Sequence, residues 1–113
     1  TSNTNNIIGK AELNLLNKEA YFINVGRGNT VNEKDLIHAL SNTTLTGAIL
    51  DVFNKEPLNK NSKLWTLNNV VVTPHIAGIT NATDYTARLL RQNFEALNKN
   101  QKLTNKVSNS KGY

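Results

Sequence analysis

Cysteine is absent from this chain, and so disulfide bonds and thiolate metal sites are excluded. No metal site is predicted, and any redox chemistry must come from a bound cofactor. Long apolar runs are also missing, since none approaches the roughly 20 residues that span a bilayer, and the N-terminus lacks the pattern of a signal peptide. We therefore expect a cytoplasmic protein that does not associate with membranes.

Methionine is absent as well. Thr1 then cannot be a translated start, and we expect the chain to be a processed or excised piece of a longer protein. Its 113 residues suffice for one modest domain or part of one. Apolar residues make up 38% of the chain and charged residues 19%, a balance that favours a packed globular unit over disorder.

The net charge is +5, from 13 basic and 8 acidic residues. A surplus of lysine and arginine is compatible with phosphate binding, so a small basic module that binds nucleic acid is one alternative. The basic residues are scattered, however, and their densest group lies near the tail, at Lys99, Lys102, Lys106 and Lys111. No aromatic residues alternate with them to stack bases, so we expect no nucleic-acid partner.

Short apolar runs alternate with helical patterns along the chain. Helices are predicted over 9–16, 32–42 and 81–97, and strands over 20–25, 46–53 and 70–73. We expect the first two strands to be buried, with 20–25 covered on both faces. The order strand, helix, strand, loop, strand predicts a parallel sheet and an α/β fold.

Three ionisable residues follow the predicted strands. Arg27 lies between Gly26 and Gly28, Glu56 precedes Pro57, and His75 follows Pro74. In open parallel sheets, ligands bind beyond the carboxyl ends of the strands, and so these side chains are expected to lie at one edge.

The three residue types suit the polarisation of a carbonyl and the movement of a proton. The planar guanidinium of Arg27 is a two-pronged donor for a carboxylate beside a ketone. A carboxylate such as Glu56 beside His75 would make the imidazole a better acid for a developing alkoxide. Each residue taken alone also has a plain structural interpretation: Arg27 could pair with an acid, Glu56 could be a solvated loop residue, and Asp51 could cap a turn.

Three ordered motifs carry a resemblance to a known family. They are Asn24-x-x-Arg27-Gly28, Asp51-Val52-Phe53-x-x-Glu56-Pro57-Leu58, and Thr73-Pro74-His75 with Ala77-Gly78. Together they resemble the C-terminal part of the D-isomer-specific 2-hydroxyacid dehydrogenases. Within that family, the segments at 62–65 and 107–113 are most similar to the bacterial glyoxylate/hydroxypyruvate reductase A group.

The resemblance implies a role for each residue in hydride transfer between NAD(P)H and a small 2-keto acid. Arg27 would bind the substrate carboxylate and carbonyl, His75 would donate the proton, and Glu56 would hold and tune His75. Asp51 would hydrogen-bond the nicotinamide carboxamide. The residues implied to line the nicotinamide are Val25, Gly26, Arg27, His75, Ala77 and Gly78.

The resemblance also implies an architecture. Residues 1–80 would form the C-terminal half of a Rossmann-like NAD(P)-binding domain, and 81–113 a crossover helix and tail that return to the substrate domain. The implied cofactor is NADP or NAD, with NADPH favoured, and the full-length protein is expected to be a homodimer.

The glycine-rich turn that binds pyrophosphate in the family is missing from this chain. We therefore expect the isolated chain to bind cofactor poorly and to show no turnover. A non-catalytic, corepressor-like nucleotide sensor of the same fold stays open as an alternative at this stage.

Overall fold

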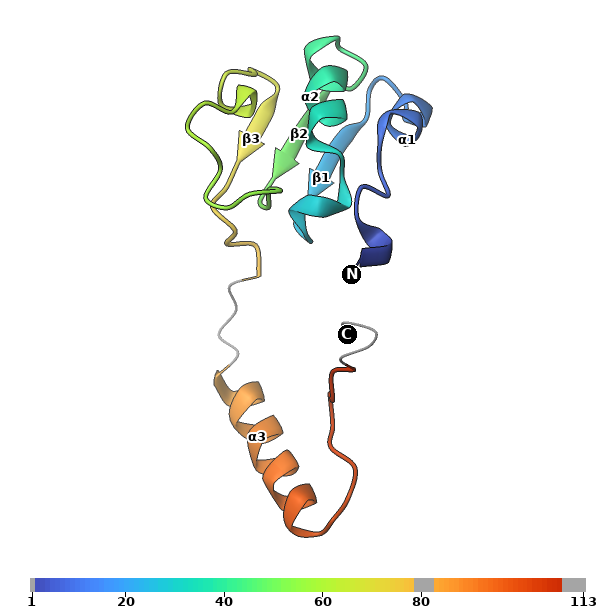
Figure 1. Ribbon diagram of the computed structural model, residues 1–113. Helices are drawn as coiled ribbons and strands as arrows, with labels where there is room; N and C mark the ends of the chain where they lie inside the picture. Colours follow the sequence, from blue (N-terminus) through green and yellow to red (C-terminus); the bar gives the residue numbers. More distant parts are fainter. Residues whose placement is uncertain (1, 79–82, 109–113) are drawn as a thin grey trace. The chain divides into compact units, whose positions relative to one another are not determined.

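The computed structural model describes residues 2–78 and 83–108 (Figure 1). The chain divides into two compact units, the first formed by Ser2–Gly78 and the second by the residues that follow it. Each unit is described by itself.

A three-stranded parallel sheet forms the centre of the first unit, in the order β1-β2-β3 (Figure 1). The strands are β1 (Tyr21–Asn24), β2 (Gly47–Leu50) and β3 (Val70–Val72). Two α-helices, α1 (Lys10–Leu15) and α2 (Glu33–Ser41), and three 3₁₀ turns, η1 (Ser2–Thr4), η2 (Gly28–Thr30) and η3 (Lys63–Trp65), complete the unit. The predicted α/β fold is confirmed.

Helix α2 begins where the sequence predicts. The Asn32 side chain accepts hydrogen bonds from the backbone N–H groups of Lys34 and Asp35, two donors that have no partner inside the helix. Glu33 and Asp35 place negative charge in the first turn, where the helix dipole is positive. The apolar stripe of α2 then faces the core, with Leu36 and Leu40 at most 2% exposed.

The core lies between the helices and one face of the sheet. Its largest fully buried apolar side chains come from α1, α2, the turn before β2, and η3, and they are Leu13, Leu36, Leu40, Leu45 and Leu64. Ala48 and Leu50 of β2 complete the contact with the sheet. Burial of each leucine side chain contributes about 1.5–3 kcal/mol.

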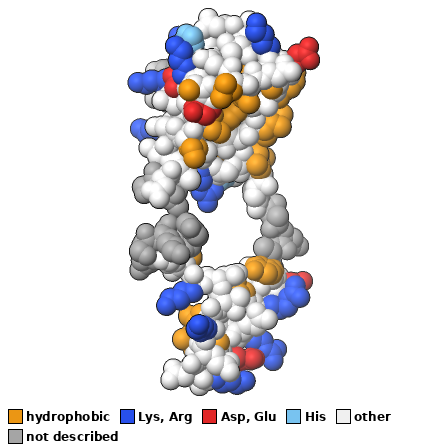
Figure 2. Space-filling view, turned by 90° about the vertical axis from the view of Figure 1, so that its right-hand side faces the viewer, with side chains coloured by type: hydrophobic (Ala, Val, Ile, Leu, Met, Phe, Trp, Pro, Cys, Tyr) orange, Lys and Arg blue, Asp and Glu red, His pale blue; other side chains and the backbone are white. Residues whose placement is uncertain are grey.

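The other face of the sheet is exposed in this unit. Parallel pairing aligns Ile23 with Ile49 and Ile49 with Val71, so these side chains share that face with Tyr21. They are 37–61% exposed, and Figure 2 shows hydrophobic side chains gathered along one side of the unit. The prediction that strand 20–25 is buried on both faces is wrong for this unit, because α1 and α2 pack in the core that covers only one face.

Strand β2 is shorter than the predicted 46–53. The backbone N–H of Asp51 makes the last ladder bond, to the carbonyl of Asn24 at 2.9 Å. Beyond it, the Asp51 side chain binds backbone groups of the loop after β3, so that 51–53 leave the sheet. The sheet therefore ends at the residues that carry the candidate site.

The second unit contains α3 (Thr83–Asn98). The predicted start of this helix at 81 lies outside the described residues. Residues 109–113 of the segment 107–113, which carries part of the resemblance, also lie outside them. Leu90, Phe94 and Leu97 follow one another at helical spacing on α3, and each is more than 60% exposed. None of the helices in the part of the chain that the structure describes is long and apolar enough to cross a membrane.

Candidate functional site

The three strands run parallel, and so their carboxyl ends meet at one edge of the sheet. Arg27 follows β1, Asp51 and Glu56 follow β2, and His75 follows β3. The topology thus brings residues far apart in the sequence to the same edge, as predicted.

Asn24 shapes the loop that carries Arg27. Its side-chain oxygen accepts from the backbone N–H of Gly26 at 3.1 Å, and its side-chain nitrogen donates to the carbonyl of Arg27 at 3.1 Å. The guanidinium is exposed and donates to the carbonyl of Gly26 at 2.8 Å. Within 2–78 and 83–108, no carboxylate forms an ion pair with Arg27, which leaves donors of its fork open to a ligand.

Gly28 brings this loop against the one that carries Glu56. A Cβ atom at Gly28 would lie 1.9 Å from the carbonyl carbon of Phe53 and 2.5 Å from its Cα. Such distances leave no room for any side chain. Glycine is therefore required at position 28 by the close packing of two backbones.

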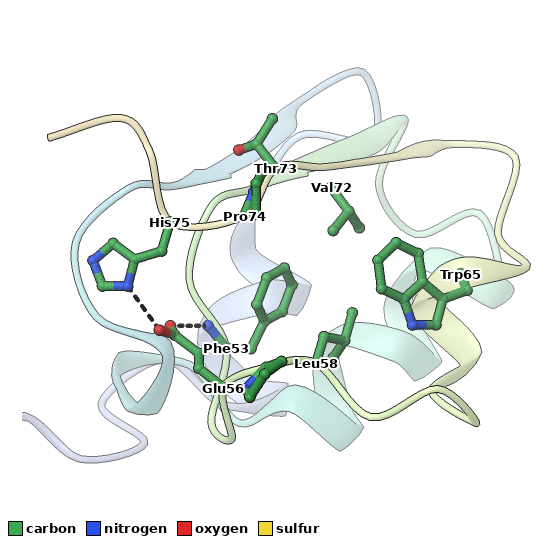
Figure 3. A pocket seen from close by; sticks show the side chains of 9 residues that line it. Phe53, Glu56, Leu58, Trp65, Val72, Thr73, Pro74 and His75 are labelled. Carbon is green, nitrogen blue, oxygen red and sulfur yellow. Dashed lines mark hydrogen bonds and ion pairs between the residues drawn. The ribbon is translucent and has the colours of Figure 1, made fainter. Parts of the chain in front are cut away.

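Glu56 and His75 form a directly bonded pair (Figure 3). The Nδ1 atom of His75 lies 2.7 Å from Oε2 of Glu56, and Oε1 of Glu56 accepts from the backbone N–H of Phe53 at 3.0 Å. The bond from His75, followed by that from Phe53, holds the pKa of Glu56 below its ordinary value. An ionised carboxylate only accepts, so the hydrogen of this bond is on Nδ1, and Nε2 takes no part in it.

Asp51 is the buried carboxylate of the site, with 1% exposure. Its Oδ1 accepts from the hydroxyl of Thr73 and from the backbone N–H of Ile76 at 3.0 Å, and its Oδ2 accepts from the N–H of Ala77 at 2.8 Å. The Thr73 hydroxyl is the largest cause that lowers the pKa of Asp51, followed by the two backbone donors, while burial opposes them. Asp51 therefore ties the end of β2 to the loop that contains His75.

A cavity of about 650 Å³ lies beside the pair and is mostly apolar. Its lining residues are Phe53, Glu56, Pro57, Leu58, Trp65, Val72, Thr73, Pro74 and His75. In Figure 3 the imidazole of His75 points away from Trp65 and Leu58, so Nε2 is not directed into this cavity. Trp65 is 54% exposed and donates its indole N–H to the carbonyl of Asn59.

The residues implied to line a nicotinamide ring are accessible. Val25 is 57% exposed, and Gly26, Ala77 and Gly78 are exposed as well. A Cβ at Gly26 would meet only the Asn24 side chain, at 3.7 Å, and one at Gly78 would meet nothing within 4 Å. These segments leave room for a flat ring to approach the backbone, and so they fit the cofactor. Their contacts with it, and that of Asp51, stay predictions.

Three contributors to the site had no predicted role. Asn24 and Thr73 were recognised only as members of motifs, and the backbone N–H of Phe53 has no signal in the sequence because every residue except proline supplies one. The other histidine, His38, is exposed on α2 and contacts Asn42.

Comparison with known proteins gives the same family as the motifs. Residues 1–77 match the family model described as "D-isomer specific 2-hydroxyacid dehydrogenase, NAD binding domain". The chain is 42% identical over 116 residues to the glyoxylate/hydroxypyruvate reductase A of Citrobacter koseri, covering 100% of this chain and 36% of that protein. It is 49% identical over 85 residues to the glyoxylate/hydroxypyruvate reductase B of an Enterobacter species, covering 75% of this chain and 26% of that protein.

Solved structures of the family superpose on the whole chain. A D-isomer-specific 2-hydroxyacid dehydrogenase from Xanthobacter autotrophicus in complex with NADPH and MES has a TM-score of 0.92 at 37% identity, covering 100% of this chain and 46% of that one. An NADPH-dependent glyoxylate/hydroxypyruvate reductase from Sinorhizobium meliloti in complex with NADP and sulfate has a TM-score of 0.88 at 31% identity. The match covers 100% of this chain and 37% of that one.

The chain spans 36% of the length of the reductase A relative from Citrobacter koseri. The family model covers more than half of the chain, and it contains all of β1, β2 and β3 together with His75. This chain belongs to the D-isomer-specific 2-hydroxyacid dehydrogenase family.

Proposed function

We propose that the chain is the C-terminal part of a reductase that transfers hydride from NADPH or NADH to a small 2-keto acid such as glyoxylate or hydroxypyruvate. The observation that carries this proposal is the 2.7 Å contact between His75 Nδ1 and Glu56 Oε2 at the carboxyl edge of the sheet. It supplies an oriented proton donor where a parallel sheet binds its ligands. The relatives named glyoxylate/hydroxypyruvate reductase support the substrate class.

The bound nicotinamide would supply the hydride, which goes to the carbonyl carbon of the keto acid. His75 gives the proton from Nε2 to the carbonyl oxygen, so that the product is a 2-hydroxy acid. Glu56 stabilises the positive imidazole that donates the proton and fixes its Nδ1–H. Arg27 binds the substrate carboxylate with its two-pronged donor and orients the carbonyl beside it.

The cofactor is proposed to be NADPH, because the two compared structures with high TM-scores hold NADPH or NADP. In this proposal residues 1–80 belong to the cofactor domain, and 81–113 carry the chain back to the substrate domain. The full-length protein is proposed to be a cytoplasmic homodimer, and the 113-residue chain alone is proposed to have no turnover.

The test is an assay of the full-length protein for NADPH and NADH oxidation with glyoxylate and hydroxypyruvate, beside two variants. His75→Gln removes the acid, and we expect kcat to fall about 10²- to 10⁴-fold. His38→Gln changes the other histidine, on an exposed position of α2, and is expected to keep full activity. Nucleotide binding without oxidation of either cofactor would show a sensor that lacks the chemistry, and the proposal would be wrong.

A further inference from the structure

The backbone of His75 adopts an uncommon conformation. Its φ is 54°, in the left-handed region that residues with a side chain rarely enter. Such a conformation persists only where the surrounding structure holds it, and it occurs often at active sites. The bond from Nδ1 to Glu56 depends on it, because φ at His75 sets the direction in which the ring leaves the chain.

Asp51 supplies bonds on both sides of this position. The hydroxyl of Thr73, two residues before His75, donates to Oδ1. The backbone N–H groups of Ile76 and Ala77, directly after His75, donate to Oδ1 and Oδ2 at 3.0 and 2.8 Å. Among the described residues, no other side chain accepts a hydrogen bond from the backbone of Ile76 or Ala77.

We propose that Asp51 is a positioning residue for the proton transfer. Its carboxylate holds the turn from Thr73 to Ala77, so that the backbone of His75 keeps its left-handed conformation and the imidazole keeps its hydrogen bond to Glu56. The inference rests on the proposed function and adds a role to a residue that the family resemblance assigns to the cofactor. In this structure both oxygens of Asp51 are already engaged, and the side chain is 1% exposed.

The variant Asp51→Asn tests whether both carboxylate oxygens are needed, because asparagine has almost the same shape but only one acceptor oxygen. Asparagine keeps the volume, but its side-chain nitrogen cannot accept the N–H of Ala77, and so two donors face one another. Asp51→Glu is too long for a fully buried site and cannot restore the bonds. Thr73→Val removes only the hydroxyl bond and leaves the two backbone bonds in place.

We expect Asp51→Asn in the full-length protein to lower kcat about 10- to 100-fold, the size of effect that follows from a misplaced catalytic group. KM for the keto acid and for NADPH should change less than about threefold. Thr73→Val should lower kcat in the same direction by a smaller factor. Thr46→Val, which removes a hydroxyl bond to the carbonyl of Lys18, is the matched control and should leave kcat unchanged.

A double-mutant cycle with His75→Gln is the decisive test. If Asp51 acts through His75, Asp51→Asn should cost less than about threefold in kcat once His75 is already glutamine. An equal cost in both backgrounds, or a rise in KM for NADPH with kcat unchanged, would overturn the proposal and leave Asp51 as a cofactor ligand or a purely structural residue.

A second readout does not need activity. The Nδ1–H proton of His75, held by a carboxylate at 2.7 Å, should give a downfield proton resonance in the full-length protein. We expect Asp51→Asn to remove or broaden it and Asp84→Asn, on an exposed residue of α3, to leave it intact. An unchanged resonance in Asp51→Asn would contradict the positioning role even if the protein proved not to be a reductase.

Discussion

The loops that carry His75 and Arg27 lie at the same edge of the sheet, but their functional groups are held differently. The His75 imidazole is bonded to Glu56, and Asp51 secures the turn around it. Among the residues that the structure describes, the Arg27 guanidinium donates a hydrogen bond only to the carbonyl of Gly26. In the proposed function, the proton donor would thus be arranged before the substrate binds, whereas the group that binds the substrate carboxylate would be ordered by its ligand.

The largest expected effect comes from breaking the hydrogen bond that holds the His75 imidazole. In Glu56→Gln one of the two acceptor oxygens is replaced by an NH₂ group, which only donates. The side chain then cannot accept from both the Nδ1–H of His75 and the N–H of Phe53, as the two oxygens of Glu56 do. We expect kcat to fall about 10²- to 10⁴-fold with little change in KM for the keto acid. Steady-state kinetics of the full-length protein measure this, with Glu19→Gln as the control on an exposed residue. A kcat within twofold of the wild type would remove Glu56 from the mechanism.

The second effect concerns the Arg27 guanidinium, which no carboxylate of the described residues holds. Arg27→Lys keeps the charge but loses the planar fork, and a charge-assisted bond contributes about 1.5–3 kcal/mol. We expect KM for glyoxylate and hydroxypyruvate to rise about 10- to 100-fold, with a smaller change in kcat. Arg91→Lys, at a side chain that is 83% exposed on α3, is the matched control. An unchanged KM would mean that Arg27 does not bind the substrate carboxylate.

The third effect concerns the contact between the Arg27 loop and the Glu56 loop. Gly28→Ala forces the backbones of Gly28 and Phe53 apart and should lower the free energy of unfolding by about 1–3 kcal/mol. Gly26→Ala, where the nearest atom lies 3.7 Å from the new Cβ, should change it by less than about 0.5 kcal/mol. Denaturant unfolding of the full-length protein distinguishes the two. Equal losses in both variants would show that the loops do not pack as described.

The smallest effect is a pH dependence of stability. Asp51 and Glu56 have pKa values below their ordinary ones, so the stability they contribute is present above those ordinary values and is lost as pH falls through the lowered ones. Melting temperature should thus decline below about pH 4, the ordinary range of carboxyl groups. Asp51→Asn should melt at a lower temperature at pH 7 and decline less on acidification. Parallel curves for the two proteins would contradict the assignment.

Much of this site could be predicted because its residues occur in ordered motifs at predicted strand ends. The place of Arg27, Glu56 and His75 at one edge follows from their positions after parallel strands, which must end together, while their roles stay predictions. Helix α2 was predictable for a local reason, the cap at Asn32 followed by acidic residues and an apolar stripe.

Other features could not be predicted, because they depend on contacts between distant segments. The clash that fixes Gly28 involves the backbone of Phe53, and the donors to Asp51 are largely backbone N–H groups that carry no sequence signal. The exposed face at Ile23 and Ile49 differs from the prediction. An apolar run shows that a strand can be covered on both faces, but whether it is covered depends on the segments that pack over it.

The most direct test of the comparison is an NMR measurement on the full-length protein that follows His75 and Arg27 together. Spectra are recorded without ligand and again after NADP and oxalate are added. We predict that the Nδ1–H resonance of His75 is present in the free protein and is lost in Glu56→Gln, whereas the Arg27 Nε–H resonance becomes protected from exchange only with ligand. A His75 resonance that arises only on ligand binding, or an Arg27 resonance already protected without it, would contradict the account.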